Sequence, residues 1–485
     1  MVLSQKHIED INEYFCKMQS KRDLLRLLNR ANYLEHGSKT KGFKLNALTY
    51  FSNPNIAKNR YTSFTISKKS GGKRVIYAPV DGLKALQAAL NLVLQCVYTP
   101  HEAATGFVKD KSIVDNARQH VGNHYVFNTD LKDFFPSIDQ ARFWGRLQHP
   151  PFNLNESNNR LTLANIIAGL CGAELEVERF RDNKWVTEKR YVLPQGAPTS
   201  PTISNIIAER LDHKLNGLAK RFGCTYSRYA DDLTFSSMHN VYKKNGEFRC
   251  ELNRIVESVN FHLKESKTRL IEDVHRQEVT GLVVNKKVNV RRRYVKKMRM
   301  WLYYWEKYGI EKANEIFEKD YQKDKGHVKE GSPGLKKVLS GKLQYMKMVK
   351  GDKDSTYQKL KKRYDDLIAG ESPIPKVLDI WEEKGIKEAM KFYYKSPTNK
   401  AKQKPEKVAN TIRKKIVDVP HESSQGSGIN FPKEPPPEFF QGFEELYSSK
   451  LPPQEVFDAV GAYLESLEDQ NDDSDNDNEA EKKNN

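Results

Sequence analysis

Two adjacent aspartates, Asp231 and Asp232, are the residues of this chain best suited to metal chemistry. They end the tetrapeptide Tyr-Ala-Asp-Asp, which lies between a strand-forming run and the apolar sequence Leu-Thr-Phe. On a tight hairpin turn, neighbouring carboxylates reach the same small volume, which is unfavourable unless a cation neutralises them. Magnesium, a hard cation that takes oxygen ligands, is the natural partner. Aspartates are also common in solvated surface turns, so a site requires further support.

A third carboxylate, Asp130, lies far upstream at the end of another predicted strand. The apolar run at residues 125–127 is typical of a buried strand, and Asp130 follows it where a side chain can meet Asp231 and Asp232. Three carboxylates on two strands match the needs of two-metal nucleotidyl transfer, in which one ion activates a hydroxyl and the other stabilises pyrophosphate. The alternative is that Asp130 caps the helix that follows.

A further segment, residues 193–201, predicts a helix that opens after a turn rich in glycine and proline. Gly196 permits a close backbone approach to a planar group, and Gln195 offers hydrogen-bond donors and acceptors beside it. Helix N-termini also favour phosphate binding. This segment lies between Asp130 and Asp231 in the sequence, which groups it with the predicted metal site.

In this order and spacing, the segments resemble the palm of a reverse transcriptase. The resemblance implies that Asp130, Asp231 and Asp232 are catalytic and bind two Mg²⁺ ions. It also implies that Phe135 blocks a ribose 2′-hydroxyl and so selects deoxynucleotides. Lys267 resembles the palm lysine that protonates departing pyrophosphate, although an exposed lysine with no such role is the alternative. Nucleotide-binding roles follow by the same resemblance for Lys68, Lys73, Arg74, Gln195 and Gly196.

The basic residues among these belong to a predicted hairpin of the fingers. Residues 64–79 alternate in polarity, and a glycine pair at 71–72 favours a turn. Lys68, Lys73 and Arg74 resemble residues that hold a triphosphate, for which arginine has bidentate geometry. The alternative is a solvated basic hairpin tip.

Two short motifs narrow the resemblance to bacterial retron reverse transcriptases. Residues 116–120 fit Asn-Ala-x-x-His, and residues 279–281 fit Val-Thr-Gly. The first precedes the strand of Asp130, and the second follows the Tyr-Ala-Asp-Asp turn, as in that family. A histidine inside a helix and a strand ending in glycine are the alternatives. From their positions, we expect Arg118, His120 and Thr280 to contact RNA.

The resemblance implies an RNA-directed DNA polymerase. Retron enzymes bind their own structured non-coding RNA and extend cDNA from a 2′-hydroxyl in it, using deoxynucleoside triphosphates, so that a branched RNA–DNA molecule (msDNA) results. Family members act in antiphage defence, often with an effector protein. The alternatives are a defence-associated reverse transcriptase without a retron RNA, and a non-catalytic RNA-binding scaffold.

The implied fold is α+β, a right-hand polymerase with fingers, a palm built on an antiparallel catalytic sheet, and a helical thumb. Leucines at 24, 25, 27 and 28 predict an apolar helical stripe near the N-terminus. Residues 150–190 resemble an insertion with a charged hairpin, to which no role is assigned. The predicted parts are a helical part of the fingers (1–60), fingers and palm (61–290), a helical thumb (291–370), a helix with a flexible linker (371–453), an amphipathic helix (454–468) and an acidic disordered tail (469–485).

The start of the predicted thumb is basic, aromatic and helical in period. Its cations would contact nucleic-acid phosphates without reading sequence. Met298, Trp301, Leu302 and Trp305 recur at helical spacing and predict a core face on the same helix. The predicted RNA-binding cations of this segment are Arg291, Arg292, Arg293, Lys296 and Lys297.

Composition favours nucleic acid as the partner. The 485 residues include 81 Lys and Arg against 63 Asp and Glu, a net charge of +18 that attracts polyanions. No apolar run approaches the roughly 20 residues needed to span a bilayer, and the N-terminus has no signal-peptide core, so no membrane association is expected. Five cysteines without a Cys-x-x-Cys pair argue against structural zinc and disulfides and favour the cytoplasm.

Overall fold

The computed structural model describes residues 3–37, 40–67, 72–182, 184–325 and 333–371, with a few helical residues between 380 and 390. Backbone contacts divide the chain into two units. The first comprises residues 1–301 and 333–358, and the second comprises residues 302–332 and 359–485. Several predictions fall outside the described residues: Lys68, most of the linker at 371–453, the helix at 454–468 and the tail at 469–485.

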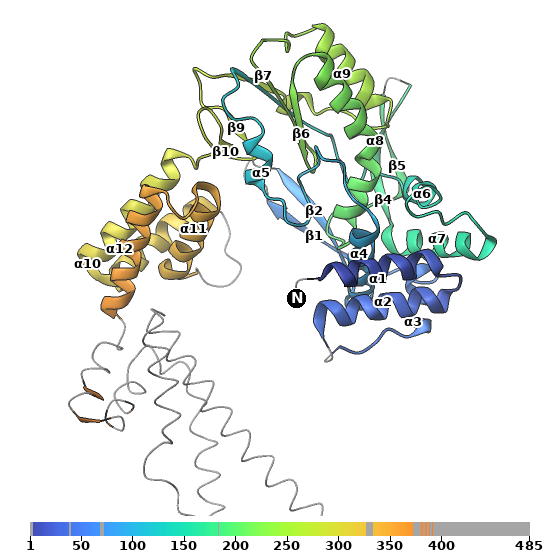
Figure 1. The fold of residues 1–485 in the computed structure, drawn as a ribbon, viewed down its shortest axis with the longest axis horizontal. Coiled ribbons are helices and arrows are strands. Elements are labelled where there is room, and N and C mark those ends of the chain that lie inside the picture. Colours follow the sequence, from blue (N-terminus) through green and yellow to red (C-terminus); the bar gives the residue numbers. More distant parts are fainter. Residues whose placement is uncertain are drawn as a thin grey trace, which may run out of the picture. The chain divides into compact units, whose positions relative to one another are not determined.

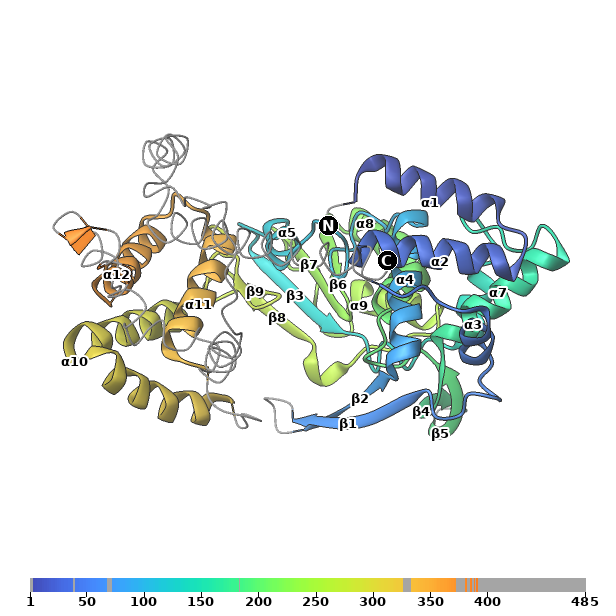
Figure 2. The same cartoon turned by 90° about the horizontal axis from the view of Figure 1, so that it is seen from below.

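The N-terminal residues form helices, as predicted. Ser20 and Asp23 form a reciprocal capping box that begins the second helix. Leu24, Leu27 and Leu28 on that helix are fully buried, and Leu25 packs partly buried against the same core. The first and second helices pack on α4, and the third packs on α7 (Figure 2). The helices are α1 (Gln5–Lys17), α2 (Lys21–His36), α3 (Leu45–Ser52), α4 (Asp81–Val97) and α7 (Asn158–Cys171).

Two antiparallel hairpins belong to the first unit. The predicted fingers hairpin is formed by β1 (Tyr61–Ser67) and β2 (Lys73–Pro79), which pair along their full length. The charged hairpin predicted within residues 150–190 is formed by β4 (Ala173–Arg181) and β5 (Lys184–Val192). Helix α7 precedes this second hairpin and was not predicted, because the Asn-rich sequence at its start masks an apolar face.

The palm is a four-stranded antiparallel sheet in the order β6-β7-β3-β8. Helices α8 and α9 pack together beside it, and their apolar residues share one buried cluster with Leu233 and Phe235 of β7 (Figure 1). The elements are β3 (Tyr125–Asp130), β6 (Thr225–Tyr229), β7 (Asp232–Ser237), β8 (Arg269–Glu272), α8 (Ser200–Arg221) and α9 (Glu247–Glu257).

The two short motifs of the sequence lie together in the structure. The Val-Thr-Gly motif forms a tight turn between β9 (Glu278–Val279) and β10 (Leu282–Val283), with left-handed φ values of 48° at Thr280 and 82° at Gly281. Helix α5 (Ile113–Arg118) contains the first three residues of the Asn-Ala-x-x-His motif and contacts this hairpin. Val114 and Ala117 share a small buried cluster with apolar residues of β9 and β10.

The described elements after residue 291 are helical, as predicted for the thumb. Helix α10 (Arg292–Lys325) is kinked at Gly309, whose φ is 75°. Its predicted core face is confirmed, because Met298, Trp301, Leu302 and Trp305 are at most 3% exposed. The contact units differ from the predicted boundary at residue 291, since the first turns of α10 and all of α11 (Leu335–Lys350) belong with the palm, whereas most of α12 (Ser355–Glu371) belongs to the second unit. None of the described helices is long and apolar enough to cross a membrane.

Candidate active site

The palm sheet brings the three predicted aspartates to one end. Asp130 ends β3 and lies directly opposite Asp232, the first residue of β7. Side chains in such a cross-strand pair have Cβ atoms about 5 Å apart. Asp231 occupies the turn between β6 and β7, and its carbonyl accepts a 2.9 Å hydrogen bond from the backbone N–H of Leu131. The strand register therefore places Asp130 beside Asp232, which is distant from it in sequence, whereas a shared metal site of all three carboxylates stays a prediction.

The surroundings of the site disfavour the charged forms of Asp231 and Asp232. Burial raises the pKa of Asp231, although the charges of Arg74 and Lys264 act in the opposite direction. Burial, together with the charge of Asp231, raises the pKa of Asp232 to about 6. Asp130 is nearly buried, and its carboxylate forms an ion pair with the ammonium of Lys267.

The donor chemistry of these aspartates fits a hard divalent cation, which takes carboxylate oxygens. A cation would also stabilise the buried negative charges of Asp231 and Asp232 and offset the repulsion between them, the two effects that raise their pKa values. In the part of the chain that the structure describes, however, no three Asp, Glu, His or Cys side chains are gathered as a formed metal site. The ion pair of Asp130 with Lys267 directs that carboxylate to the lysine, so binding of two ions stays a prediction.

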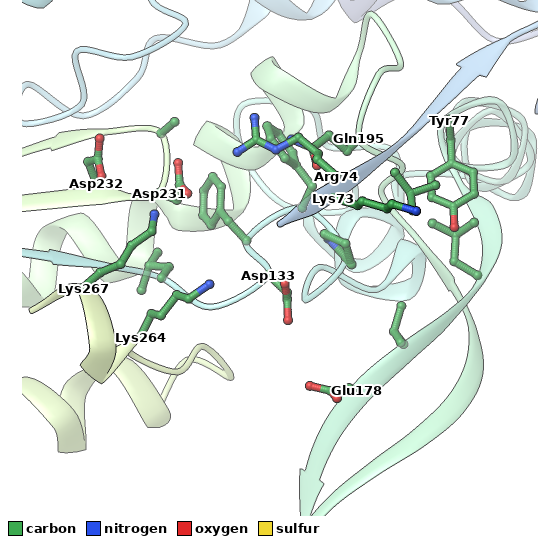
Figure 3. A pocket seen from close by; sticks show the side chains of 18 of the residues that line it. Lys73, Arg74, Tyr77, Asp133, Glu178, Gln195, Asp231, Asp232, Lys264 and Lys267 are labelled. Carbon is green, nitrogen blue, oxygen red and sulfur yellow. The ribbon is translucent and has the colours of Figure 1, made fainter. Parts of the chain in front are cut away.

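A cavity of about 840 Å³, called here the palm cavity, opens beside the aspartates. Figure 3 shows Asp231, Asp232 and Lys267 on one side of it, with Lys73 and Arg74 of β2 on the other. Cations from the fingers thus face carboxylates from the palm, which suits a metal-bound triphosphate. The predicted residues that line the cavity are Lys73, Arg74, Phe135, Gln195, Asp231, Asp232 and Lys267.

Gly196 lies in close contact with strand β2. Its φ of 127° favours glycine, but an added Cβ would lie 2.8 Å from the carbonyl oxygen of Tyr77 and from Ile76 Cγ2. The backbone N–H of Tyr77 also donates a 2.8 Å hydrogen bond to the carbonyl of Gln195. The missing side chain therefore lets this loop dock on β2. A direct contact of Gly196 with nucleotide stays a prediction, whereas Gln195 lines the palm cavity.

A buried ion pair beneath the Tyr-Ala-Asp-Asp turn was not found by sequence reasoning. Arg228 and Asp212 have side chains 0% and 1% exposed, and the guanidinium donates two hydrogen bonds to the carboxylate at 2.7 and 2.6 Å. The same guanidinium donates to the carbonyl of Ala230 at 3.1 Å. Ala230 has a left-handed φ of 57°, so this contact supports a strained turn. The available signal was a charged residue inside the strand Thr-Tyr-Ser-Arg-Tyr.

Gly106 is a second residue that the sequence did not reveal. A Cβ at this position would lie 2.5 Å from the backbone nitrogen of Ala230, closer than real Cβ atoms approach other atoms. The carbonyl of Gly106 accepts a 2.9 Å hydrogen bond from Asn205 of α8. Only glycine therefore lets this loop approach the Tyr-Ala-Asp-Asp turn so closely. Lys264, which also lines the palm cavity, was likewise missed.

The predicted contact of His120 with RNA is wrong. His120 is 0% exposed, and both of its ring nitrogens are hydrogen-bonded within the protein, at 2.7 Å to Ser236 Oγ and 2.7 Å to Ser227 Oγ. Burial lowers the pKa of His120 to about 3, so the ring is neutral. It faces the palm sheet and has no surface to offer a nucleic acid.

The other predicted RNA-binding residues are accessible to different degrees. The Arg118 side chain is 70% exposed. Thr280 is partly buried, and its hydroxyl donates to the carbonyl of Ile113 at 3.3 Å. Lys297 is partly buried, with its ammonium 5.9 Å from the ring centroid of Trp301. Among the predicted RNA-binding cations at the start of α10, the exposed ones are Arg291, Arg292, Arg293 and Lys296.

A second cavity of about 940 Å³ adjoins the start of α10 and is called here the basic cavity. Arg291 is held there by an ion pair with Glu278 at 2.5 Å. Cations outnumber acidic residues in its lining, which creates an attractive potential for phosphates. The cations that line it are Arg276, Lys286, Lys287, Arg291, Arg292 and Arg293.

The chain is similar to known proteins across the region that carries this geometry. The family model for reverse transcriptase (RNA-dependent DNA polymerase) matches residues 66–290. The retron Mx162 reverse transcriptase of Myxococcus xanthus is 40% identical over 46% of this chain and 47% of its own length. The retron Mx65 reverse transcriptase of the same organism is 35% identical over 54% and 60%, respectively. The chain thus spans about half the length of these two relatives.

A third relative is covered more completely. The retron Ec86 reverse transcriptase of Escherichia coli is 33% identical over 245 residues, which make up 50% of this chain and 68% of that protein. The region matched by the family model contains all three aspartates, strand β2, the β4–β5 hairpin and the two short motifs.

Proposed function

This chain belongs to the retron reverse transcriptases, and from that premise we propose that it copies RNA into DNA. The observation that carries the proposal is the register of the palm sheet, which sets Asp130 opposite Asp232 beside a cavity lined by cations. A non-catalytic RNA-binding scaffold would have no need to keep buried carboxylates whose pKa values are raised by their surroundings.

In the proposed reaction, the terminal hydroxyl oxygen of the growing strand attacks the α-phosphorus of a deoxynucleoside triphosphate, and pyrophosphate leaves. Asp130, Asp231 and Asp232 would hold the divalent ions, which lower the pKa of the attacking hydroxyl and offset the charge of pyrophosphate. Lys73 and Arg74 bind the triphosphate from the fingers side. Gln195 hydrogen-bonds the nucleotide, and Lys267 donates a proton to the leaving group.

The partner in this proposal is a structured non-coding RNA that also serves as template. Arg118 and the cations of the basic cavity would bind its phosphates and position it without reading its sequence. We include in the proposal the priming of cDNA from a 2′-hydroxyl of that RNA, the branched product and a role in antiphage defence with an effector protein. These follow from membership of the family.

The test is to purify the full chain with its bound nucleic acid and supply deoxynucleoside triphosphates with Mg²⁺. We expect labelled DNA that stays joined to RNA through a 2′,5′ linkage, and sequencing identifies the RNA. Unbranched DNA would remove the retron-type priming. Bound RNA without incorporation on it or on added primed templates would instead support the scaffold.

Phe135→Ala is expected to weaken selection against ribonucleotides. Phe135 lines the palm cavity, where its ring lies 6.1 Å from that of Phe107. Truncation opens space for a 2′-hydroxyl, and a change of this size in an apolar contact alters discrimination by roughly 10- to 100-fold. The measurement is the ratio of kcat/KM for deoxynucleotide and ribonucleotide. Phe180→Ala, an exposed phenylalanine on β4, is the control, and equal ratios in both variants would remove Phe135 from this role.

A further inference from the structure

We propose that His120 is a positioning residue, which locks together the two strands whose turn carries Asp231 and Asp232. The Asn-Ala-x-x-His motif then affects catalysis by holding strands β6 and β7 in place, and other residues bind the RNA. This inference rests on the proposed function, because the property that it explains is the rate of DNA synthesis.

The geometry of the contact supports this role. Ser227 lies on β6 and Ser236 on β7, and both side chains are completely buried. In the register of the two strands, Ser227 pairs with Thr234 and Thr225 pairs with Ser236, so the two serines lie diagonally on the same face. The imidazole bridges them with two hydrogen bonds of 2.7 Å.

The chemistry of the ring matches the bridge. A neutral imidazole donates through one nitrogen and accepts through the other, and a serine hydroxyl can do either. Because His120 carries no charge in this environment, the bridge persists across the pH range in which the protein would work. Each serine therefore has a partner that its strand neighbours do not provide.

The asparagine of the motif is linked to the same hairpin. Asn116, fully buried on α5, accepts a 2.7 Å hydrogen bond from the hydroxyl of Thr105. The backbone N–H of Thr105 donates to the carbonyl of Arg228 at 2.9 Å. Arg228 immediately precedes the Tyr-Ala-Asp-Asp turn. Both ends of the motif thus support β6 just before the catalytic residues.

Replacement of His120 by leucine removes both hydrogen bonds while filling much of the same volume. We expect kcat to fall about 10- to 100-fold, because small misplacements of reacting groups have effects of that size. The KM for deoxynucleotide and the affinity for RNA should stay within about twofold, since neither binding surface changes. His120→Gln, whose amide can both donate and accept, should recover part of kcat.

The experiment compares His120→Leu, His120→Gln, Ser227→Ala and the double variant His120→Leu/Ser227→Ala in the full chain. Gln119→Ala is the matched control, because Gln119 is the exposed neighbour of His120. Measured quantities are single-turnover rate, KM, RNA affinity and hydrogen exchange of residues 225–237. We expect faster exchange in this segment for both single apolar variants, and a combined rate loss smaller than the product of the separate losses.

Three outcomes would overturn the inference. The first is an RNA affinity that falls in His120→Leu at unchanged single-turnover rate. The second is a combined loss equal to the product, which would mean that His120 and Ser227 act independently. The third is unaltered hydrogen exchange of residues 225–237. Ser227→Ala leaves His120 in place and keeps the idea testable if His120→Leu fails to fold. Exchange needs no activity, so an inactive parent protein would refute the proposed function alone. Faster exchange in the variants would still support the bridge between the strands, and unaltered exchange would still overturn it.

Discussion

Asp232→Asn is expected to abolish DNA synthesis while making the metal-free protein more stable. The amide removes the charge proposed to bind a divalent ion, and the loss of several kcal/mol of transition-state stabilisation would lower the rate about a thousandfold or more. The same substitution removes a carboxylate that burial and Asp231 already disfavour. A residue that serves only structure would change both properties in the same direction.

The pH dependence of this stability gain follows from the raised pKa of Asp232. Its value of about 6 exceeds the ordinary aspartate value of 3.8, so the folded state binds this proton more tightly than the unfolded state. The contribution of Asp232 to folding therefore falls as pH rises from about 4 to about 6 and stays unfavourable above that. At 1.36 kcal/mol for each pKa unit, the gain in Asp232→Asn at neutral pH is on the order of 3 kcal/mol. It should vanish near pH 4.

Thermal unfolding with and without Mg²⁺ measures this prediction, together with DNA synthesis on a primed template. Magnesium should raise the Tm of the unsubstituted protein, because it binds the folded state, and should raise that of Asp232→Asn much less. Asp182→Asn is the control, since Asp182 is exposed at the tip of the β4–β5 hairpin and its positive φ also suits asparagine. Synthesis that persists in Asp232→Asn would move the metal site elsewhere.

Local sequence patterns were sufficient to predict the front of the site. The apolar run before Asp130 predicts a strand, and the Tyr-Ala-Asp-Asp turn is flanked by runs that predict two more. The fingers hairpin is signalled by alternation and a glycine pair. Each of these signals lies within a few residues of the element it predicts. The structure therefore has a strand at each predicted place, namely β1, β2, β3, β6 and β7.

The support behind the site depends on partners distant in sequence, and no local pattern predicts them. His120 lies 107 and 116 positions from its two serines, so its burial could not be inferred from the surrounding residues. Gly196 was identified as a site of close approach, but the group that approaches it belongs to β2. Residue type thus indicates that a position is special, whereas the fold decides which neighbour makes it so.

The second large effect is expected from Arg228→Met, which should lower the free energy of unfolding by about 3–5 kcal/mol. Burial works against the charge of Arg228, but Asp212 more than offsets it and raises the pKa of Arg228 above its usual value. Removing the arginine leaves the Asp212 carboxylate buried, with Tyr226 as a remaining hydrogen-bond donor at 2.9 Å. Urea unfolding of the metal-free protein measures the loss.

A double variant separates two effects of this ion pair: its contribution to the free energy of unfolding and its support of the Tyr-Ala-Asp-Asp turn. Arg228→Met/Asp212→Leu removes both charges, and apolar replacements of a buried ion pair are often neutral or stabilising. Unfolding should therefore return close to that of the parent protein. DNA synthesis should remain low, because the carbonyl of Ala230 still lacks the hydrogen bond from the guanidinium.

Arg228→Lys completes the comparison, because lysine keeps the charge but has no planar fork to bind Asp212 and Ala230 together. It should be more stable than Arg228→Met and still impaired in kcat. Recovery of both stability and full synthesis in the double variant would show that the turn holds its shape without the arginine. The left-handed φ of Ala230 argues that it does not, since a strained backbone conformation persists only when its surroundings hold it.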